Sequence, residues 1–309
     1  MRTISLEGDA HYSNYIFDKA LNAYHRALIY VSRQQTPQLW AATHMDIGRA
    51  NGELGIRAEG LAIAQYFSAA VKAYHQALEV YTREQLPQDW AMTQNNLGTA
   101  LQDQGIRTGG EAGTHLLAEA VTAYRQALEV RTLNTLPPQW AQTQNNLAQA
   151  YTHLEDWANV AASYSNVLTV YPDDKKAYDT ASYLYHETLF EFPRAFMLNQ
   201  RWLERNPADI AALSDFAERH FTTGRFTECE QRITILLANP AVGPSIQIAL
   251  QAIQIANSLA LGKTDLVPGR IDAMVEDINN QSEGFKVSWS FKGTRNFINN
   301  NETLAPYRP

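Results

Sequence analysis

The chain has 309 residues, of which 45% are hydrophobic and 18% charged, an ordinary composition for a globular protein. Its net charge of −7 disfavours nucleic acid or an anionic membrane surface as a partner, and its single cysteine, Cys229, excludes an internal disulfide framework. The first residues lack the apolar core of a signal peptide, and no segment approaches the ~18 apolar residues of a membrane span. We therefore expect a cytoplasmic protein.

The first predicted helix follows a short polar segment. Residues 1–12 show no periodic pattern, so we expect a loose lead-in there. From about residue 13, apolar residues recur at helical spacing through Ile16, Ala20 and Tyr24. A small residue beside a large ring allows two helices to approach closely. Pro37 then fits the first turn of the next helix, which we predict at 38–53.

Two further copies of this helical pattern follow along the chain. We predict helices at 61–83, 88–104 and 115–133, with loops at 56–60 and 105–113. The period is 50 residues, given by Trp40, Trp90 and Trp140 and by Tyr24, Tyr74 and Tyr124. Their helical spacing and small neighbours favour a core role for these rings over ligand stacking. A repeat of this length predicts stacked helical units rather than one closed core.

After Trp140 the period shortens. Residues 141–174 span 34 positions, the stretch 175–209 fits the same pattern less well, and 210–243 fits it again. Residues from Pro244 onward predict one more helix pair, with helices at 246–261 and 271–279. We accordingly divide the chain into a lead-in (1–12), long repeats (13–140), short repeats (141–243), a terminal helix pair (244–283) and a non-repeat tail (284–309).

These patterns resemble a known family. Residues 141–174 and 210–243 are similar to tetratricopeptide repeats, which are helix–turn–helix units of that length. Residues 41–140, with their Ala-Tyr-x-x-Ala-Leu-Glu and Asn-Asn-Leu motifs, are similar to the lengthened repeats of kinesin light chains and of bacterial multi-repeat proteins. The resemblance covers about 13–243. It implies an all-α, right-handed superhelical solenoid of antiparallel helix pairs with a short non-repeat C-terminal segment.

The most informative polar feature is a repeated amide pair. In the family that this chain resembles, asparagines on the concave face hydrogen-bond the backbone of an extended peptide, because one amide offers both donors and acceptors. The resemblance implies the same role for the following residues: Asn95, Asn96, Thr99, Asn145, Asn146 and Gln149. The first unit has Asp46 in place of an amide, and Arg49 there would suit an acidic partner. The alternative is that these amides are solvated or bond a neighbouring helix.

Other motifs argue against catalysis. The glycine-rich stretch 105–113 lacks the Gly-Lys-Ser/Thr ending of a phosphate loop, and it follows a helix. The eight histidines form no i, i+4 pair with a carboxylate, so we predict no metal site and no cofactor. Cys229 reads as a small packed residue.

The tail contains a change of period. Phe285, Val287, Trp289 and Phe291 alternate with polar residues, which would place four large side chains on one face of an extended segment. We expect this segment to cap the helix at 246–261. The alternatives are that it folds back into the chain's own groove or pairs with another chain.

The expected function is binding. We predict a protein–protein interaction module that holds an extended peptide or partner protein in its concave groove, as a scaffold or sensor and not as an enzyme. One alternative is self-assembly into a homo-oligomer, or a role as a regulatory region of a larger bacterial signalling protein. An enzyme is the third and least favoured reading.

Overall fold

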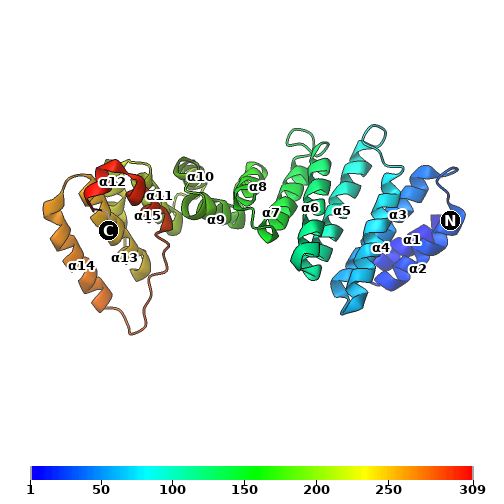
Figure 1. The fold of residues 1–309 in the computed structure, drawn as a ribbon, viewed down its shortest axis with the longest axis horizontal. Coiled ribbons are helices and arrows are strands. Elements are labelled where there is room, and N and C mark those ends of the chain that lie inside the picture. Colours follow the sequence, from blue (N-terminus) through cyan, green and yellow to red (C-terminus); the bar gives the residue numbers. More distant parts are fainter. Residues whose placement is uncertain (1, 308–309) are drawn as a thin grey trace. The chain divides into compact units, whose positions relative to one another are not determined.

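The computed structural model describes residues 2–307, and its regular elements over that range are all helices (Figure 1). The chain divides into two compact units, Met1–Val170 and Tyr171–Pro309, called here the N-terminal and C-terminal units. The all-α prediction is confirmed. The right-handed superhelix and the sequence-derived boundaries at 140, 243 and 283 stay predictions.

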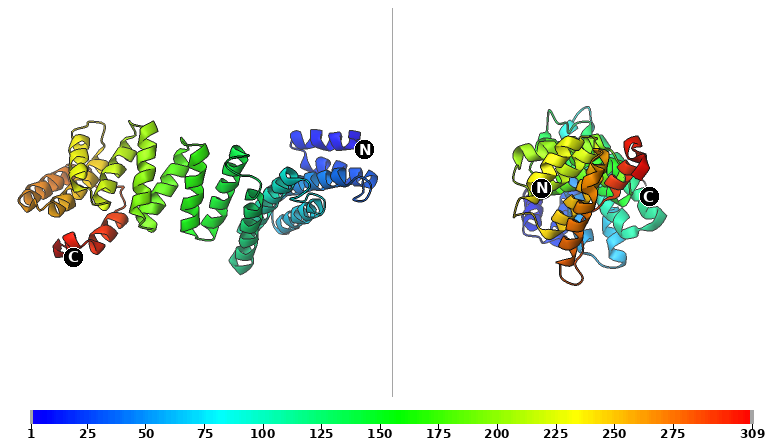
Figure 2. Two further views of the ribbon diagram at one scale, coloured as in Figure 1. Left: turned by 90° about the horizontal axis from the view of Figure 1, so that it is seen from above. Right: turned by 90° about the vertical axis from the view of Figure 1, so that its left-hand side faces the viewer.

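The N-terminal unit contains eight α-helices in its described part. Their bounds are α1 (Arg2–Ser13), α2 (Phe17–Ala27), α3 (Pro37–Arg57), α4 (Leu61–Leu78), α5 (Pro87–Thr108), α6 (Gly110–Leu128), α7 (Pro137–His153) and α8 (Trp157–Val170). They form four consecutive pairs, each packed on the next, and they follow one another in sequence order (Figure 2). The first helices also touch one another, α3 with α5 and α5 with α7. These first helices therefore share one face, called here the first-helix face.

A glycine beneath a tyrosine ring recurs in three of these pairs. A Cβ atom placed on Gly8, Gly48 or Gly98 would lie within 2.4–2.7 Å of a ring carbon of Tyr24, Tyr74 or Tyr124 respectively. These tyrosines are at most 4% exposed. The core role predicted for them is confirmed, whereas the repeated tryptophans are only half-buried. Glycine on the first helix thus permits the close approach that the sequence pattern attributed to alanine alone.

Two expectations for the N-terminal unit were wrong. Residues 2–12 form α1 instead of a loose lead-in, and its Asp9 carboxylate accepts a hydrogen bond from the Tyr24 hydroxyl at 2.9 Å. The glycine-rich stretch 105–113 is mostly helical, with only Gly109 between α5 and α6. Its glycines serve helix contact, since a Cβ on Gly113 would lie 2.5 Å from the carbonyl oxygen of Gly105.

Several predicted helix ends also shift. The helices predicted to reach residues 83 and 133 end at Leu78 and Leu128, and the helix predicted from 115 begins at Gly110. The predicted loop at 56–60 is shorter, because α3 continues to Arg57.

The C-terminal unit begins with three helix pairs. Their bounds are α9 (Lys175–Tyr183) with the π-helical turn η2 (Leu184–Thr188), α10 (Phe192–Arg205), α11 (Ile210–Thr222), α12 (Phe226–Leu237), α13 (Pro244–Ala260) and α14 (Val267–Asn279). Asp174 and Asp209 cap α9 and α11, because each carboxylate accepts a backbone N–H of the first turn. The last pair begins earlier than predicted in both helices. Cys229 is fully buried in the core, where burial raises the pKa of its thiol, and its predicted packing role is confirmed.

The tail folds back onto this unit. After an extended stretch it forms α15 (Lys292–Asn300) and the short helix η4 (Glu302–Tyr307), which the sequence analysis did not predict. α15 contacts α11 and η2, and η4 contacts α13; in Figure 2 this red segment turns back along the unit. Leu304, 1% exposed, joins the core cluster that contains Leu250 and Ile253 of α13.

Candidate functional site

The repeated amide residues that were predicted to bind a peptide are only partly available to a ligand. Asn95 is 4% exposed, and its side-chain oxygen accepts hydrogen bonds from Thr143 Oγ1 at 3.0 Å and from Asn146 Nδ2 at 3.3 Å. These bonds join α5 to α7. Asn95 is thus used in helix packing, which is the alternative that the sequence had left open.

Three of the predicted residues come together on α3 and α5. Arg49, Asn96 and Thr99 line a cavity of about 200 Å³ on the first-helix face, together with Tyr12 of α1. The Arg49 guanidinium carbon lies 4.5 Å from the centre of the Tyr12 ring, and Nη1 lies 3.3 Å from the Asp46 carboxylate. Sequence analysis missed Tyr12 because it lies in the segment taken for a loose lead-in.

The remaining predicted residues lie on α7. Asn145, Asn146 and Gln149 are half-buried, at positions 50 residues after Asn95, Asn96 and Thr99. The structure therefore places Asn96, Asn146 and their neighbours at equivalent positions along one face. It does not test their role in binding.

Two carboxyl groups on the first-helix face have pKa values above the ordinary value. Burial raises the pKa of Asp46 to about 6, and the nearby Asp9 carboxylate adds to the rise while Arg49 opposes it. Burial also raises the pKa of Asp103, which lines the cavity beside Thr99. The cavity thus offers amide, hydroxyl, guanidinium and carboxyl groups within reach of one another.

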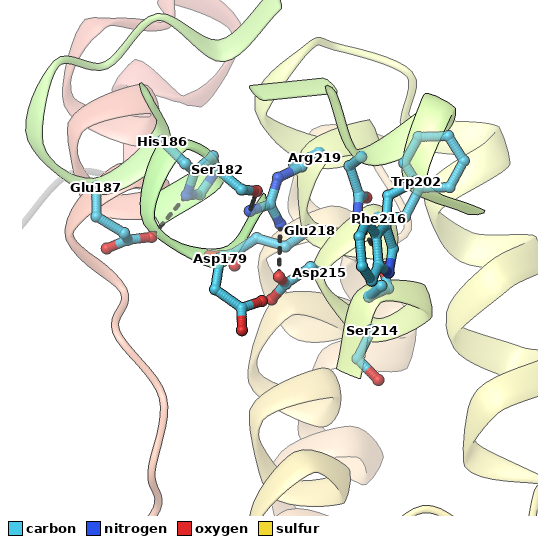
Figure 3. A network of polar contacts seen from close by, with 12 residues as sticks. Asp179, Ser182, His186, Glu187, Trp202, Ser214, Asp215, Phe216, Glu218 and Arg219 are labelled. Carbon is cyan, nitrogen blue, oxygen red and sulfur yellow. Dashed lines mark hydrogen bonds and ion pairs between the residues drawn. The ribbon is translucent and has the colours of Figure 1, made fainter. Parts of the chain in front are cut away.

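The C-terminal unit holds a larger polar site that the sequence analysis did not find. The side chains of His186, Glu187, Glu218 and Arg219 are each at most 6% exposed. His186 Nδ1 and Glu187 Oε1 are 2.6 Å apart (Figure 3). His186 Nε2 lies 3.2 Å from Thr222 Oγ1. Both His186 and Glu187 belong to the π-helical turn, a kind of helix distortion often found at functional sites.

The end of the extended stretch and the first turn of α15 bond directly to these buried carboxylates. Glu187 Oε2 accepts the backbone N–H groups of Lys292 at 3.0 Å and Gly293 at 3.3 Å, and also the Ser290 hydroxyl. Gly293 has to be small, because a Cβ there would lie 2.6 Å from the His186 ring. The backbone of the tail therefore fits closely against the turn.

A second buried carboxylate holds the next residues of the tail. Glu218 Oε2 accepts the Trp289 indole N–H at 3.1 Å, and Glu218 Oε1 accepts the Thr294 hydroxyl. The tail also bonds α13, where the Ser288 N–H donates to Ser245 Oγ at 2.7 Å.

The predicted contact of the tail with the last helix pair is confirmed in part. Trp289 and Phe291 pack against the core cluster that contains Leu250 and Ile253 of α13. The same segment also reaches α11 and η2, so it has features of the fold-back alternative as well. Pairing with another chain stays untested.

The pKa values of the two glutamates are shifted in opposite directions. Burial alone would raise the pKa of Glu187, but hydrogen bonds from His186 and Ser290 outweigh it and hold the pKa below its ordinary value. Burial raises the pKa of Glu218, although the nearby His186 and the Thr294 hydroxyl oppose the rise.

His186, Glu187 and Glu218 each have one potential metal-ligating atom within 4.8 Å of the others, so these three side chains could coordinate one metal ion. The carboxylate oxygens already accept hydrogen bonds from the tail, however, and Arg219 supplies a neighbouring positive charge. This arrangement fits tail anchoring without an ion.

An open pocket lies beside the tail. Its volume is about 780 Å³, and we call it the acidic pocket after its four carboxylates. The residues that characterise it are Asp179, Glu187, Asp215, Glu218, Tyr183 and Trp289. Arg219 also lines it, with Nη2 donating to Ser182 Oγ at 2.7 Å and Nη1 3.3 Å from the Asp215 carboxylate (Figure 3).

Comparisons with known proteins give structural matches only. No protein-family model and no curated protein matches the sequence. A tetratricopeptide repeat protein from Parabacteroides merdae is similar over 96% of this chain and 97% of its own, with 12% identity and a TM-score of 0.41. The complex of the yeast Sti1 TPR2AB domain with pHSP90 is similar over 90% of this chain and 98% of its own, with 15% identity and a TM-score of 0.28.

Both matched proteins contain tetratricopeptide repeats, the kind that this sequence resembles. Within each unit, the described residues form consecutive helix pairs that pack on one another, and the tetratricopeptide character of these pairs stays an inference from the sequence. The kinesin-light-chain-like detail of its longer repeats stays a prediction. Among the helices of residues 2–307, none combines the length and the apolar character needed to cross a membrane.

Proposed function

We propose that this chain is a protein–protein interaction module that binds an extended segment of a partner on its first-helix face. The observation that supports this function best is the position of the chain's own tail. Residues 288–290 lie across the C-terminal unit and bond Ser245 of α13, Glu218 of α11 and Glu187 of η2.

The chemistry of these contacts is general for polypeptide. In the extended stretch, the backbone N–H of Ser288 donates to the Ser245 hydroxyl of α13, so part of the recognition does not depend on sequence. An extended chain presents such groups at regular spacing, because it has no internal hydrogen bonds to satisfy them. A helix face with fixed polar side chains can therefore hold a peptide in register.

We place the partner's segment on the equivalent face of the N-terminal unit. The proposed contacts are Arg49, Asn96, Thr99, Asn145, Asn146 and Gln149. Asn95 is left out, because its amide oxygen is already used between α5 and α7. The cavity lined by Arg49, Asn96 and Thr99 offers one side-chain pocket along the path.

The test uses a display library of short unstructured peptides selected against the intact chain. Selected peptides should bind at least about tenfold more weakly to Asn96→Ala with Asn146→Ala, because each lost amide leaves a backbone group of the peptide unpaired. The matched control is Lys72→Ala with Thr122→Ala, two exposed positions on the second helices α4 and α6.

Circular dichroism should show unchanged helicity in both double variants. Equal affinity for all three proteins would exclude the first-helix face of the N-terminal unit as the binding site. Peptides that lose affinity only for the control variant would move the site to the second helices.

A further inference from the structure

The acidic pocket of the C-terminal unit has no role in the proposal above. Its carboxylates come from three parts of the chain, with Asp179 on α9, Glu187 on η2, and Asp215 and Glu218 on α11. The tail completes one wall through Ser288, Trp289 and Ser290. The pocket therefore exists only when the tail is folded onto the unit.

The charges around this pocket do not balance. Asp179, Glu187 and Asp215 line it together with Glu218, whose pKa burial raises, whereas the basic lining residues are Arg219 and His186. Lys175 pairs with Asp179 from outside the pocket, but both side chains are about half-exposed, so water screens that pair. A negatively charged ligand would be repelled, and a positively charged one would be attracted.

Aromatic side chains strengthen the preference for a cation. Trp289 and Tyr183 both line the pocket, and Tyr183 is 47% exposed. An ammonium or guanidinium group is attracted to the face of such rings. The methylene groups of a lysine or arginine side chain can cover apolar ring surface at the same time.

An independent observation comes from Arg219. It is 3% exposed, its Nε atom has no hydrogen-bond acceptor, and its Nη1 atom has only the ion pair with Asp215 at 3.3 Å. A buried guanidinium normally has acceptors for its N–H groups. An N–H left without an acceptor beside a pocket points to an oxygen supplied by a ligand, and a peptide carbonyl is such an oxygen.

We infer that the acidic pocket binds a lysine or arginine residue of a partner's polypeptide segment. The positive group lies among the carboxylates of Asp179 and Asp215, the side-chain stem packs against Trp289, and a carbonyl oxygen of the segment faces Arg219. This inference rests on the proposed function for its partner class, and it adds a specificity that the amide positions of the N-terminal unit do not have.

The experiment follows the Trp289 indole N–H resonance by NMR, assigned with Trp289→Phe. The probes are N-acetyl-lysine methylamide, its uncharged analogue N-acetyl-norleucine methylamide and the acidic N-acetyl-glutamate methylamide. The lysine probe should shift the resonance and bind at least about tenfold more tightly than norleucine, with an affinity that falls as salt is added. The glutamate probe should leave the resonance unchanged.

Variants then locate the binding. Asp179→Asn with Asp215→Asn should weaken the lysine probe about tenfold or more, whereas Asp272→Asn, an exposed change on α14, should not weaken it. Asp179→Asn alone should reduce the affinity for the lysine probe by a smaller factor. Because Asp179 is half-exposed, this single substitution leaves the ion pair between Asp215 and Arg219 in place.

Equal binding of lysine and norleucine, or an unchanged affinity in the double variant, would overturn the inference. Preferential binding of the glutamate probe would make the pocket an anion site through Arg219 and overturn it too. The peptide selection described above tests a different unit, so either proposal can fail while the other stands.

Discussion

The pairing of glycine with tyrosine makes a sharp prediction about stability. Gly98 and Gly52 both lie inside long helices of the N-terminal unit, α5 and α3. A Cβ on Gly98 would lie 2.7 Å from Tyr124 Cε1, whereas a Cβ on Gly52 meets nothing within 4 Å. Replacing each by alanine therefore adds the same methyl group to a crowded site and to an open one.

The magnitudes follow from two opposing effects. Alanine is favoured over glycine inside a helix by about 1 kcal/mol, and both variants gain this. Gly98→Ala must also move the Tyr124 ring, which is fully buried, and overpacking of that kind costs about 1–3 kcal/mol. Gly52→Ala should thus be stabilising. The free energies of unfolding of the two variants should differ by about 1–3 kcal/mol, because both gain equally from replacing glycine by alanine inside a helix.

Urea unfolding followed by circular dichroism measures this difference. Both substitutions lie in the same unit, so a change in either should appear in the same transition. A midpoint for Gly98→Ala equal to or above that of Gly52→Ala would refute the argument. Gly48→Ala should repeat the result of Gly98→Ala, because its Cβ would lie 2.6 Å from Tyr74.

Further outcomes follow from the burial and contacts of single residues. Asn95→Ala should lower the free energy of unfolding by about 1–3 kcal/mol, measured in urea, because its side-chain oxygen accepts two interhelical hydrogen bonds. Ala127→Phe should cost at least about 1–3 kcal/mol in the same assay, since Ala127 is fully buried. Asp46→Asn should stabilise the protein at pH 7 by up to about 3 kcal/mol and have no such effect near pH 4. The reason is that the pKa of Asp46 is raised to about 6 in the folded state, so the folded protein loses stability as the pH rises from about 4 to 6. Thermal melts of both proteins at the two pH values would detect the difference. Deleting 284–309 should lower the melting temperature and promote aggregation, seen by light scattering, because Leu304 belongs to the core.

The repeated part of the fold could be predicted from the sequence because its contacts are local. The 50-residue period places Tyr24, Tyr74 and Tyr124 at equivalent positions, and each packs within its own helix pair. α1 was missed in part because it packs against the Tyr24 ring through Gly8, which has no side chain. A pattern of apolar residues does not register that contact.

The glycine-rich stretch 105–113 shows a second limit. Glycine favours loops, but it also allows two backbones to approach closely, and composition cannot separate these uses. Gly113 serves the second purpose, next to Gly105.

The candidate sites were predictable in part. Helical spacing located the face that carries Asn96, Thr99 and Asn146, but it could not distinguish buried Asn95 from half-buried Asn96, which are adjacent in sequence. The acidic pocket depends on contacts between Glu187 and residues more than 100 positions later. No local pattern reports such a contact. The alternation at 285–291 did mark the tail as a segment with one half-buried apolar face.

The bonds of the tail have a consequence for how the protein is made. Ser290 and Lys292 are 103 and 105 residues after Glu187, whereas neighbouring helix pairs are complete within a few tens of residues. During synthesis, the helix pairs of the N-terminal unit can form as soon as they have emerged, because all their partners are close in sequence. The buried charges of the C-terminal unit must wait for nearly the last residues of the chain. Until then Glu187 has His186 but lacks its donors from the tail, and Glu218 lacks Trp289 and Thr294. This unit should therefore acquire its native packing late, and ribosome-bound chains that stop before residue 288 should show it loosely folded.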